Sequence, residues 1–340
     1  MKNKIKILLS ISFLLFILTS CNLPFFQNDT TEKITITENK TDHSITVDDS
    51  NINENGYNVI FECDNGYRII TKTNLSNKIN KPSNPTKDFA TFKGWYYNNQ
   101  EFNFNNTINK DVTLIAKWDL DYEGLVNYFY KNTIKANIKV ITTSYNYSTT
   151  FGYSQSTSSG IIFNSDSNYY YALTNNHSVA KASDKNNVMH EVVDAYGNTY
   201  ETGVLCNDLT YDLAVIKFTK STKKPLDIIK FASYDSFIGQ KLISVGNPNS
   251  LNNTILFGNT KSYKTIVPDS SSLDSSNVQF EVLAHTCEIA HGSSGGAVLD
   301  TSFNLVGINF ASVDYTSGEF YEGYAIPLSK INEFLHEYLY

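Results

Sequence analysis

The feature that most constrains the fold is a series of short apolar segments separated by turn residues, from residue 138 almost to the C-terminus. Many short strands with turn signals between them indicate a β-sandwich or a pair of barrels. Aromatic residues, enriched in strands, make up 14% of the chain. We expect strands at 138–145, 159–163, 169–174, 188–195, 199–204, 213–218, 241–245, 278–284, 297–300 and 305–310, followed by a helix over 327–340.

Three polar residues lie at the ends of these expected strands. His177 follows the strand 169–174, Asp212 precedes the strand 213–218, and Ser294 lies in a Gly-Ser-Ser-Gly-Gly run before the strand 297–300. A serine hydroxyl needs an adjacent base to act as a nucleophile, and the base needs a carboxylate to hold its tautomer. The sequence therefore predicts Ser294 as nucleophile, His177 as base and Asp212 as the residue that orients it.

Other nearby residues compete for these roles. Asp208 is a rival for the carboxylate, although it lies outside the apolar strand, whereas His285, Glu288 and His291 are too close in sequence to Ser294 to replace the strand-end pair. A lone histidine after a strand is usually structural. The order His, Asp, Ser at strand ends is what indicates a hydrolase.

Residues 134–335 resemble the protease domain of the trypsin-like superfamily, in particular its bacterial HtrA (Deg) branch. The matching runs are at 159–162, 174–177, 212–215, 246–248, 292–296, 307–309 and 323–327. The resemblance implies two six-stranded β-barrels with the triad between them, and cleavage of peptide bonds through an acyl-enzyme. It also implies an oxyanion hole made by the backbone amides of Gly292, Ser293 and Ser294, since glycines suit amides that face a developing oxyanion in a tight turn.

The chain departs from this family at several positions. No residues follow the expected C-terminal helix, so we expect no PDZ domain. Ser293 stands where digestive trypsins carry an aspartate, which argues against activation by a freed N-terminal ammonium. His291 replaces a small residue or proline, and is expected to block or tune the oxyanion loop or to contact substrate.

The resemblance also places candidate residues at the primary specificity pocket. Glu288 is expected near the base of the pocket, where a buried carboxylate would favour a basic side chain; the alternative is a solvated glutamate in a loop. Phe310 and Ser312 are expected beside the pocket, with Ser312 narrowing it.

The N-terminus has the pattern of a targeting signal. Three lysines precede an apolar run over 7–18, which is shorter than the roughly 20 residues that span a bilayer and is typical of a signal-peptide core. The run ends in Leu-Thr-Ser-Cys, which resembles the lipobox of bacterial lipoproteins and implies lipid on Cys21 after removal of residues 1–20. An ordinary secretory signal is the alternative. We expect the mature protein at the outer face of the bacterial cell membrane.

Two further segments precede the catalytic domain. Residues 21–56 are polar and predict a flexible tether, with a short strand at 34–37 as an option. Residues 57–118 contain strand-like runs, the motifs Lys-Pro and Asn-Pro-Thr at 81–86, Phe-Lys-Gly-Trp-Tyr at 92–96 and Leu-Ile-Ala-Lys-Trp at 114–118. They resemble the internalin-type B-repeat, a β-grasp-like module. Residues 119–135 are expected as a connecting helix and 136–340 as the protease domain.

Composition excludes several classes of function. The net charge is −7 without an evident basic face, so nucleic acid is not an expected partner. The four cysteines show no CxxC spacing, which argues against a zinc or dithiol site, and no cofactor is predicted. Cys206 and Cys287 form either a disulfide or two buried thiols.

Two functions from different classes remain. The first is a surface-tethered serine endopeptidase that acts on a protein or peptide. The second is a lipid-anchored binding or adhesion protein, in which the B-repeat module binds a surface ligand and the protease fold is inactive. An esterase on the same fold is a third option.

Overall fold

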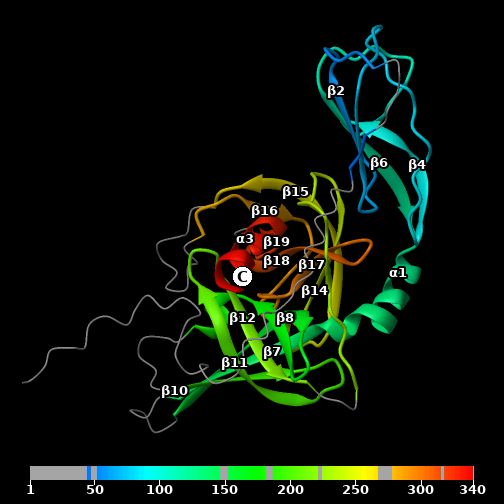
Figure 1. Ribbon diagram of the computed structural model, residues 1–340. Coiled ribbons are helices and arrows are strands. Elements are labelled where there is room, and N and C mark those ends of the chain that lie inside the picture. Colours follow the sequence, from blue (N-terminus) through cyan, green and yellow to red (C-terminus); the bar gives the residue numbers. More distant parts are fainter. Residues whose placement is uncertain are drawn as a thin grey trace, which may run out of the picture.

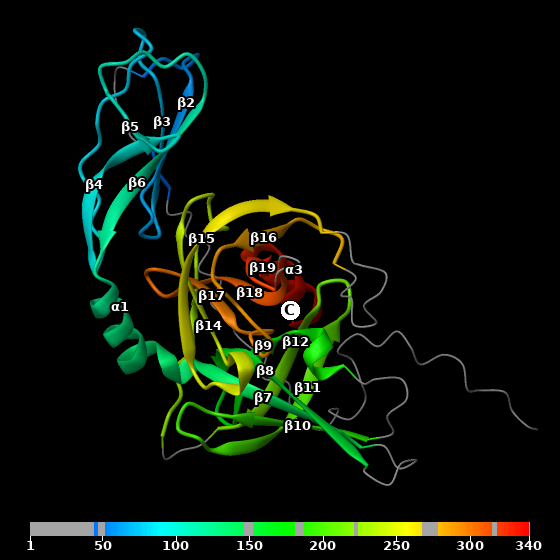
Figure 2. The same ribbon diagram turned by 180° about the vertical axis from the view of Figure 1, so that it is seen from behind.

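The computed structural model describes residues 44–46, 52–145, 152–180, 187–220, 224–266, 278–314 and 318–339. In these parts the chain forms a small β module, a connecting helix and a larger domain of two β-barrels (Figure 1). The module projects from one side of the larger domain, and the view from behind shows the same arrangement (Figure 2). The predicted mainly β fold, with a small β module before a double barrel, is confirmed.

The module is one six-stranded sheet around an aromatic core. Trp95 and Phe61 are each 1% exposed, and their ring centroids lie 4.8 Å apart. The indole of Trp118 is partly buried and donates to the carbonyl of Cys63, so both tryptophans have structural contacts. In spatial order the strands are β1 (Ser44–Thr46), β3 (Arg68–Lys72), β2 (Asn58–Glu62), β6 (Val112–Leu120), β4 (Ala90–Tyr97) and β5 (Gln100–Glu101).

Strand β1 lies within the stretch expected as a flexible tether. It pairs in parallel with β3, Ser44 opposite Arg68, and Ile52 forms a β-bridge with Asn74. The expectation of a tether without structure is therefore wrong for these residues, because the exposed edge of β3 supplies partners for backbone groups. The optional strand at 34–37 lies outside the described residues.

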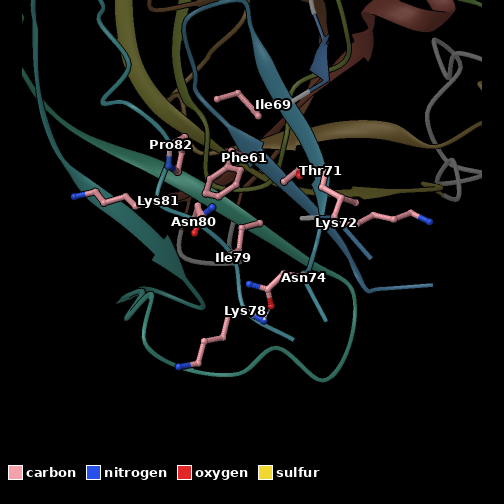
Figure 3. Close-up of a pocket in the computed structure, with 11 residues that line it drawn as sticks. Phe61, Ile69, Thr71, Lys72, Asn74, Lys78, Ile79, Asn80, Lys81 and Pro82 are labelled. Carbon is pink, nitrogen blue, oxygen red and sulfur yellow. Dashed lines mark hydrogen bonds between the residues drawn. The ribbon is translucent and has the colours of Figure 1, made fainter. Parts of the chain in front are cut away.

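A shallow pocket of about 200 Å³ lies on the module, beside β3 (Figure 3). Phe61, Ile69 and Ile79 form its apolar part, and Lys72, Lys78 and Lys81 are at its margin. The ammonium groups of these lysines point away from Phe61. The pocket therefore has an apolar floor without cations directed into it.

The connection between module and barrels is a bent helix that packs on the larger domain. Helix α1 (Tyr122–Tyr128) is capped by Asp121, whose carboxylate accepts from the amide of Gly124 at 2.9 Å. The helix continues as a π-turn, η2 (Phe129–Thr133), and a 3₁₀ turn, η3 (Ile134–Ala136). Leu125 and Phe129 are buried in the core shared by the two barrels.

The first barrel is closed by six strands. Its interior is apolar and includes Ile138, Val140, Ile162, Ala172 and Ala214. Around the barrel the strands are β7 (Asn137–Tyr145), β8 (Tyr153–Ser165), β9 (Tyr169–Thr174), β12 (Leu213–Thr219), β11 (Thr199–Asp208) and β10 (Asn187–Val193).

The second barrel closes through the pairing of β18 with β19, and β13 (Lys230–Phe231) adds to it at β18. Its interior includes Leu242, Leu283, Val298 and Val306. Around the ring the strands are β18 (Asn304–Asp314), β17 (Ala297–Asp300), β14 (Lys241–Gly246), β15 (Thr254–Lys264), β16 (Val282–His285) and β19 (Phe320–Pro327).

Helix α3 (Leu328–Leu339) covers the junction of the barrels, as expected for the C-terminal segment. Leu328, Ile331, Phe334 and Leu335 form its buried face, at helical spacing. Tyr338 donates to the carboxylate of Asp208 at 2.7 Å, which ties the helix to the first barrel. Among the helices that the structure describes, none is long and apolar enough to cross a bilayer.

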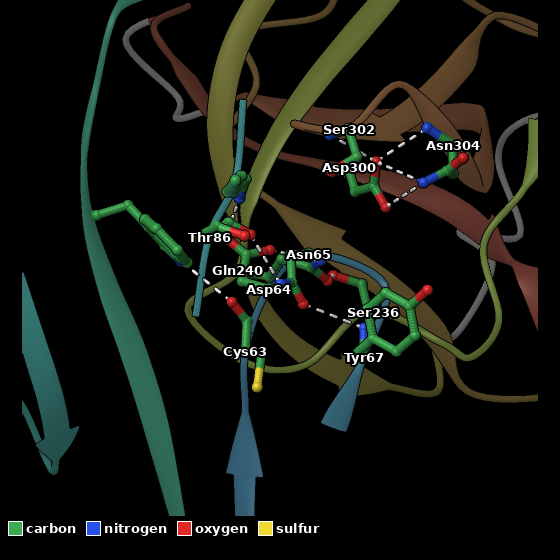
Figure 4. Close-up of polar contacts among 12 residues, drawn as sticks. Cys63, Asp64, Asn65, Tyr67, Thr86, Ser236, Gln240, Asp300, Ser302 and Asn304 are labelled. Carbon is green, nitrogen blue, oxygen red and sulfur yellow. Dashed lines mark hydrogen bonds and ion pairs between the residues drawn. The ribbon is translucent and has the colours of Figure 1, made fainter. Parts of the chain in front are cut away.

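The module meets the second barrel through a buried polar cluster (Figure 4). Asp64 pairs with Lys87 at 2.6 Å within the module and accepts from Gln240 of the barrel at 2.8 Å. Tyr234 donates to the carbonyl of Tyr67 at 3.2 Å, and its ring lies 4.1 Å from the guanidinium of Arg68. Ordered contacts therefore fix the module on the barrel.

A second carboxylate adds to the electrostatics of this contact. Burial, together with a smaller effect from the charge of Asp64, raises the pKa of Asp300 to about 6, although hydrogen bonds from Asn304 oppose the shift. Burial also raises the pKa of Asp64, although Lys87 opposes that effect. The contact therefore places two carboxylates with raised pKa close to one buried ammonium.

Candidate active site

The pairing of β9 with β12 brings two predicted residues to the same end of the first barrel. The strands are antiparallel, with Thr174 opposite Ala214, so β9 ends where β12 begins. Helix α2 (Asn176–Val179) starts directly after β9 and carries His177, while Asp212 immediately precedes β12. The register alone thus places an imidazole beside a carboxylate.

His177 and Asp212 make two hydrogen bonds. Asp212 Oδ2 lies 2.7 Å from His177 Nδ1, and Asp212 Oδ1 accepts from the backbone amide of His177 at 2.9 Å. Asp212 has no exposed surface, whereas the side chain of His177 is 29% exposed. Because Nδ1 faces the carboxylate, Nε2 is the imidazole nitrogen available to another group.

Asp212 is held in a strained conformation. Its φ is 49°, in the left-handed region, which costs about 1–3 kcal/mol for a residue other than glycine. The side-chain amide of Asn175, which is fully buried, donates to the carbonyl of Asp212 at 2.9 Å. Asn175 therefore helps to hold the backbone turn that directs the carboxylate at His177.

The loop with Ser294 packs against the strand end that carries His177. An added Cβ at Gly295 would lie 2.1 Å from the carbonyl oxygen of Ser159 and 2.4 Å from Thr174 Oγ1. Thr174 is three residues before His177, so the loop packs against the strand that leads to the imidazole. The glycine is needed there for its φ of 79° and for the close approach.

Some backbone amides of this loop donate to an acceptor within the protein, and others do not. The amide of Ser293 donates to the carbonyl of Ala290 at 2.9 Å, so the expected contribution of Ser293 to an oxyanion hole is wrong. Among the described residues, the amides of Gly292 and Ser294 have no acceptor. These two N–H groups remain for a ligand.

Asp208, the rival carboxylate, is engaged elsewhere. Its Oδ1 accepts from the amides of Thr210 and Tyr211, at 2.6 and 2.9 Å, and its Oδ2 accepts from Tyr338. It thus closes a turn and anchors α3, and the structure places Asp212 rather than Asp208 at His177.

The residues predicted for the specificity pocket lie on two segments and differ in burial. Glu288 is exposed in the loop after β16, so it does not provide a buried carboxylate. His291 is exposed, and its carbonyl accepts from the amide of Asn249 at 2.7 Å. Phe310 is buried at 5% exposure on β18, and Ser312 is exposed on the same strand.

A buried carboxylate on β19 was not expected from the sequence. Glu322 is ion-paired to Lys261 at 2.8 Å and to Lys264, and accepts from the hydroxyl of Tyr324 at 2.7 Å. Burial alone would raise the pKa of Glu322, but these hydrogen bonds outweigh it and lower the pKa to about 2. The only sequence signal was an acidic residue beside the run at 323–327.

Three other titratable groups of the two barrels are buried. His285 contacts Asn309 through Nε2 at 3.0 Å, and desolvation lowers its pKa to about 4. Cys206 and Cys287 are buried free thiols rather than a disulfide, and burial raises the pKa of Cys287 to about 12. No group of three or more His, Cys, Asp or Glu in the described ranges is arranged to hold a metal ion.

Two family models match the chain. Residues 158–308 match the trypsin-like peptidase domain, and residues 57–117 match the Listeria-Bacteroides repeat domain. Residues 158–308 are thus similar to trypsin-like peptidase domains. Both resemblances drawn from the sequence are thereby confirmed, the HtrA branch by the relatives that follow.

Curated relatives match over the same region. One is a probable periplasmic serine endoprotease, DegP-like, of Buchnera aphidicola subsp. Schizaphis graminum, which is 32% identical over 50% of this chain and 32% of its own length. Another is the serine protease Do-like HtrB of Bacillus subtilis, which is 31% identical over 53% of this chain and 38% of its own length. The chain therefore spans less than half of these two relatives.

Solved structures of proteases also align with the chain. An HtrA-type protease with a tripeptide aligns at a TM-score of 0.48 and 22% identity, covering 63% of this chain and 62% of that one. The active form of a protease from M. tuberculosis aligns at a TM-score of 0.48 and 20% identity, covering 63% and 86%.

Proposed function

We propose that the protein is a serine endopeptidase with Ser294 as nucleophile, His177 as general base and acid, and Asp212 as the residue that orients it. The observation that carries this is the His177–Asp212 pair beside a loop in which two amides lack acceptors. The family match supports it, since the matched domain is a peptidase domain.

Each step of the reaction has a group in this arrangement. His177 Nε2 takes the proton of Ser294 as Oγ bonds to the peptide carbonyl carbon, and Asp212 stabilises the imidazolium. The amides of Gly292 and Ser294 donate to the resulting oxyanion. His177 then protonates the leaving amine, which gives an acyl-enzyme, and water deprotonated by His177 releases the acid and restores Ser294.

A fluorophosphonate probe tests this proposal, because it phosphonylates only an activated serine. We expect the wild type and Ser329→Ala to be labelled, since Ser329 is an exposed serine at the start of α3. We expect Ser294→Ala and His177→Ala to remain unlabelled. Absence of labelling of the wild type between pH 6 and 9 would contradict the proposal and leave the binding-protein alternative.

A peptide library then separates a peptidase from an esterase. Cleavage of internal peptide bonds supports the proposal, whereas turnover of esters alone contradicts it. Because Glu288 is exposed, we expect no marked preference for lysine or arginine before the cleaved bond.

We propose that lipid on Cys21 anchors the mature protein to the outer face of the cell membrane, with the repeat module holding the peptidase domain away from the bilayer. The apolar run at 7–18 and the lipobox-like residues support this. Several acyl chains give stable anchoring, whereas one gives only reversible binding. Incorporation of labelled palmitate, lost in Cys21→Ser, is expected; equal incorporation in both would contradict it.

A further inference from the structure

The carbonyl groups of residues 291–294 are all held by hydrogen bonds. His291 accepts from the amide of Asn249 at 2.7 Å, and Ser293 accepts from the amide of Gly296 at 2.9 Å. The carbonyls of Gly292 and Ser294 both accept from Ser159, through its hydroxyl at 2.7 Å and its amide at 2.8 Å. One residue of the first barrel thus fixes two carbonyls of the loop.

These bonds determine where the free amides point. In a trans peptide the C=O and the following N–H point in opposite directions. The free N–H of Gly292 belongs to the peptide unit between residues 291 and 292, and the free N–H of Ser294 to the unit between residues 293 and 294. The hydroxyl of Ser159 holds the carbonyl of the unit between them, which joins Gly292 to Ser293. Rotation of this middle unit changes ψ of Gly292 and φ of Ser293, the two angles that set how the flanking peptide units, and with them the two free amides, lie relative to each other.

The hydroxyl of Ser159 has one direction in which to donate. Its oxygen accepts from the backbone amide of Asn247 at 2.8 Å and from the side-chain amide of Asn247 at 3.2 Å. A serine hydroxyl has one proton and two lone pairs. Since Asn247 occupies the lone pairs, the proton is directed to the carbonyl of Gly292.

The two side chains that set this bond are buried. Ser159 has no exposed surface and Asn247 is 1% exposed. Asn247 is itself held, because its side chain also donates to the carbonyl of Ile138 at 3.0 Å and accepts from the amide of Asn253 at 3.0 Å. Loss of the Ser159 hydroxyl would therefore remove a donor that the buried surroundings hold in one place, and no other protein donor in the described residues bonds the carbonyl of Gly292.

From these contacts we infer that Ser159 is a positioning residue of the oxyanion hole, a role that rests on the peptidase function proposed above. Ser159 touches no reacting atom. It acts through the peptide between Gly292 and Ser293, and Asn247 directs its proton. The site is thereby formed before substrate binds.

Steady-state cleavage of a peptide by Ser159→Ala tests this inference. Removal of a complete oxyanion donor lowers kcat by about 10²- to 10³-fold. In Ser159→Ala both amides remain but are less well oriented, so the loss in kcat should be smaller. We expect kcat to fall by about 10- to 100-fold, with KM within about twofold of wild type. We expect the affinity for a peptide aldehyde, whose adduct places an oxyanion in the hole, to fall by the same factor as kcat.

Two further variants make the result decisive. Ser158→Ala removes a neighbouring buried serine hydroxyl of β8 and should retain wild-type kcat. Ser159→Cys keeps a side chain of similar shape but replaces the hydroxyl with a weaker hydrogen-bond donor, so its kcat should lie between those of wild type and Ser159→Ala. If thermal melting shows that Ser159→Ala is unfolded, the kcat of Ser159→Cys tests the inference in its place.

The inference is overturned if folded Ser159→Ala has wild-type kcat, if only KM changes, or if the aldehyde binds it as tightly as it binds wild type. If Ser159→Ala is unfolded, wild-type kcat in Ser159→Cys overturns it. Failure of the peptidase proposal itself is distinct, because the wild type would then be inactive.

Discussion

At the scale of single residues, the hydrogen bonds between His177 and Asp212 lead to a sharp prediction. Asp212→Asn keeps the size of the side chain but removes the charge and one acceptor, so the imidazole is held in the wrong tautomer. We expect kcat for peptide cleavage to fall by about 10⁴-fold with little change in the melting temperature. Stopped-flow or steady-state assays with a fluorogenic peptide measure this.

Asp208→Asn is the matched control. Asp208 closes a turn and accepts from Tyr338 of α3, away from His177. The variant should lose some thermal stability while kcat stays within a few-fold of wild type. A large fall in kcat for Asp208→Asn and none for Asp212→Asn would reverse the proposed assignment.

Gly295 of the site and Gly197 in the turn between β10 and β11 allow steric and conformational effects to be separated. Gly295 and Gly197 have similar backbone angles, with φ of 79° and 84°. An added Cβ at Gly295 would lie 2.1 Å from the carbonyl of Ser159, whereas at Gly197 it would meet nothing within 4 Å. We expect Gly197→Ala to destabilise by about 1–2 kcal/mol and Gly295→Ala by clearly more, with loss of activity only in the latter. Chemical denaturation measures both, and equal losses would show that the close approach is unimportant.

At the scale of elements, most strands were predictable and two long ones were not. Strands β7, β9 and β12 are apolar runs bounded by turn residues, and their ends revealed His177 and Asp212. Strand β15 was missed because most of its residues are only half-buried, with no clear alternation, and Gly258 interrupts it. Strand β19 contains a glycine and ends in proline, residues that usually argue against a strand.

Some residues of the candidate site could likewise be predicted from the sequence, and others could not. The His177–Asp212 pair could be predicted because the proposed chemistry requires these residue types and the strand ends bring them together. The roles of Ser159 and Asn247 were not, since they depend on contacts between segments far apart in sequence. Glu288 shows the limit of counting from Ser294, because the side chain at that position is exposed.

The ion pairs between Glu322 of β19 and two lysines of β15 carry a pH-dependent stabilisation. Glu322 has a folded pKa of about 2, below its ordinary value of 4.5, because the lysines and Tyr324 bond its ionised form. Its contribution to stability is therefore complete above about pH 4.5 and is lost as the pH falls toward 2. Urea unfolding should show that Glu322→Gln has a lower free energy of unfolding than wild type at pH 7. The difference between the two should become smaller below pH 4.5.

Lys330 and Glu333 supply a control for that measurement. They form an exposed ion pair on α3 at 2.7 Å, and exposed pairs contribute little. Glu333→Gln should follow the wild-type curve within about 0.5 kcal/mol at both pH values. A gap between wild type and Glu322→Gln that stays constant down to pH 2.5 would contradict the assigned pKa.

At the scale of the whole molecule, the repeat module is fixed to the peptidase domain rather than joined by a bare linker. Helix α1 buries Leu125 in the barrel core, and the ring of Tyr122 meets that of Phe257 with centroids 4.9 Å apart. The buried cluster of Asp64, Lys87 and Gln240 adds a second attachment (Figure 4). Two attachments at different points restrict rotation of the module.

This double attachment predicts that the module and the barrels unfold in a single transition. When the polar contact is removed, we expect them to unfold in two separate transitions. The double variant Gln240→Ala with Tyr234→Ala removes the bonds to Asp64 and to the carbonyl of Tyr67 but leaves the module's own ion pair intact. We expect calorimetry to show one transition for wild type and an earlier, separate module transition for the variant. Lys93→Ala, which breaks an exposed ion pair with Asp119 inside the module, should keep the single transition. If the double variant also melts in one transition at the wild-type temperature, α1 alone holds the module, and the buried cluster does not contribute to docking.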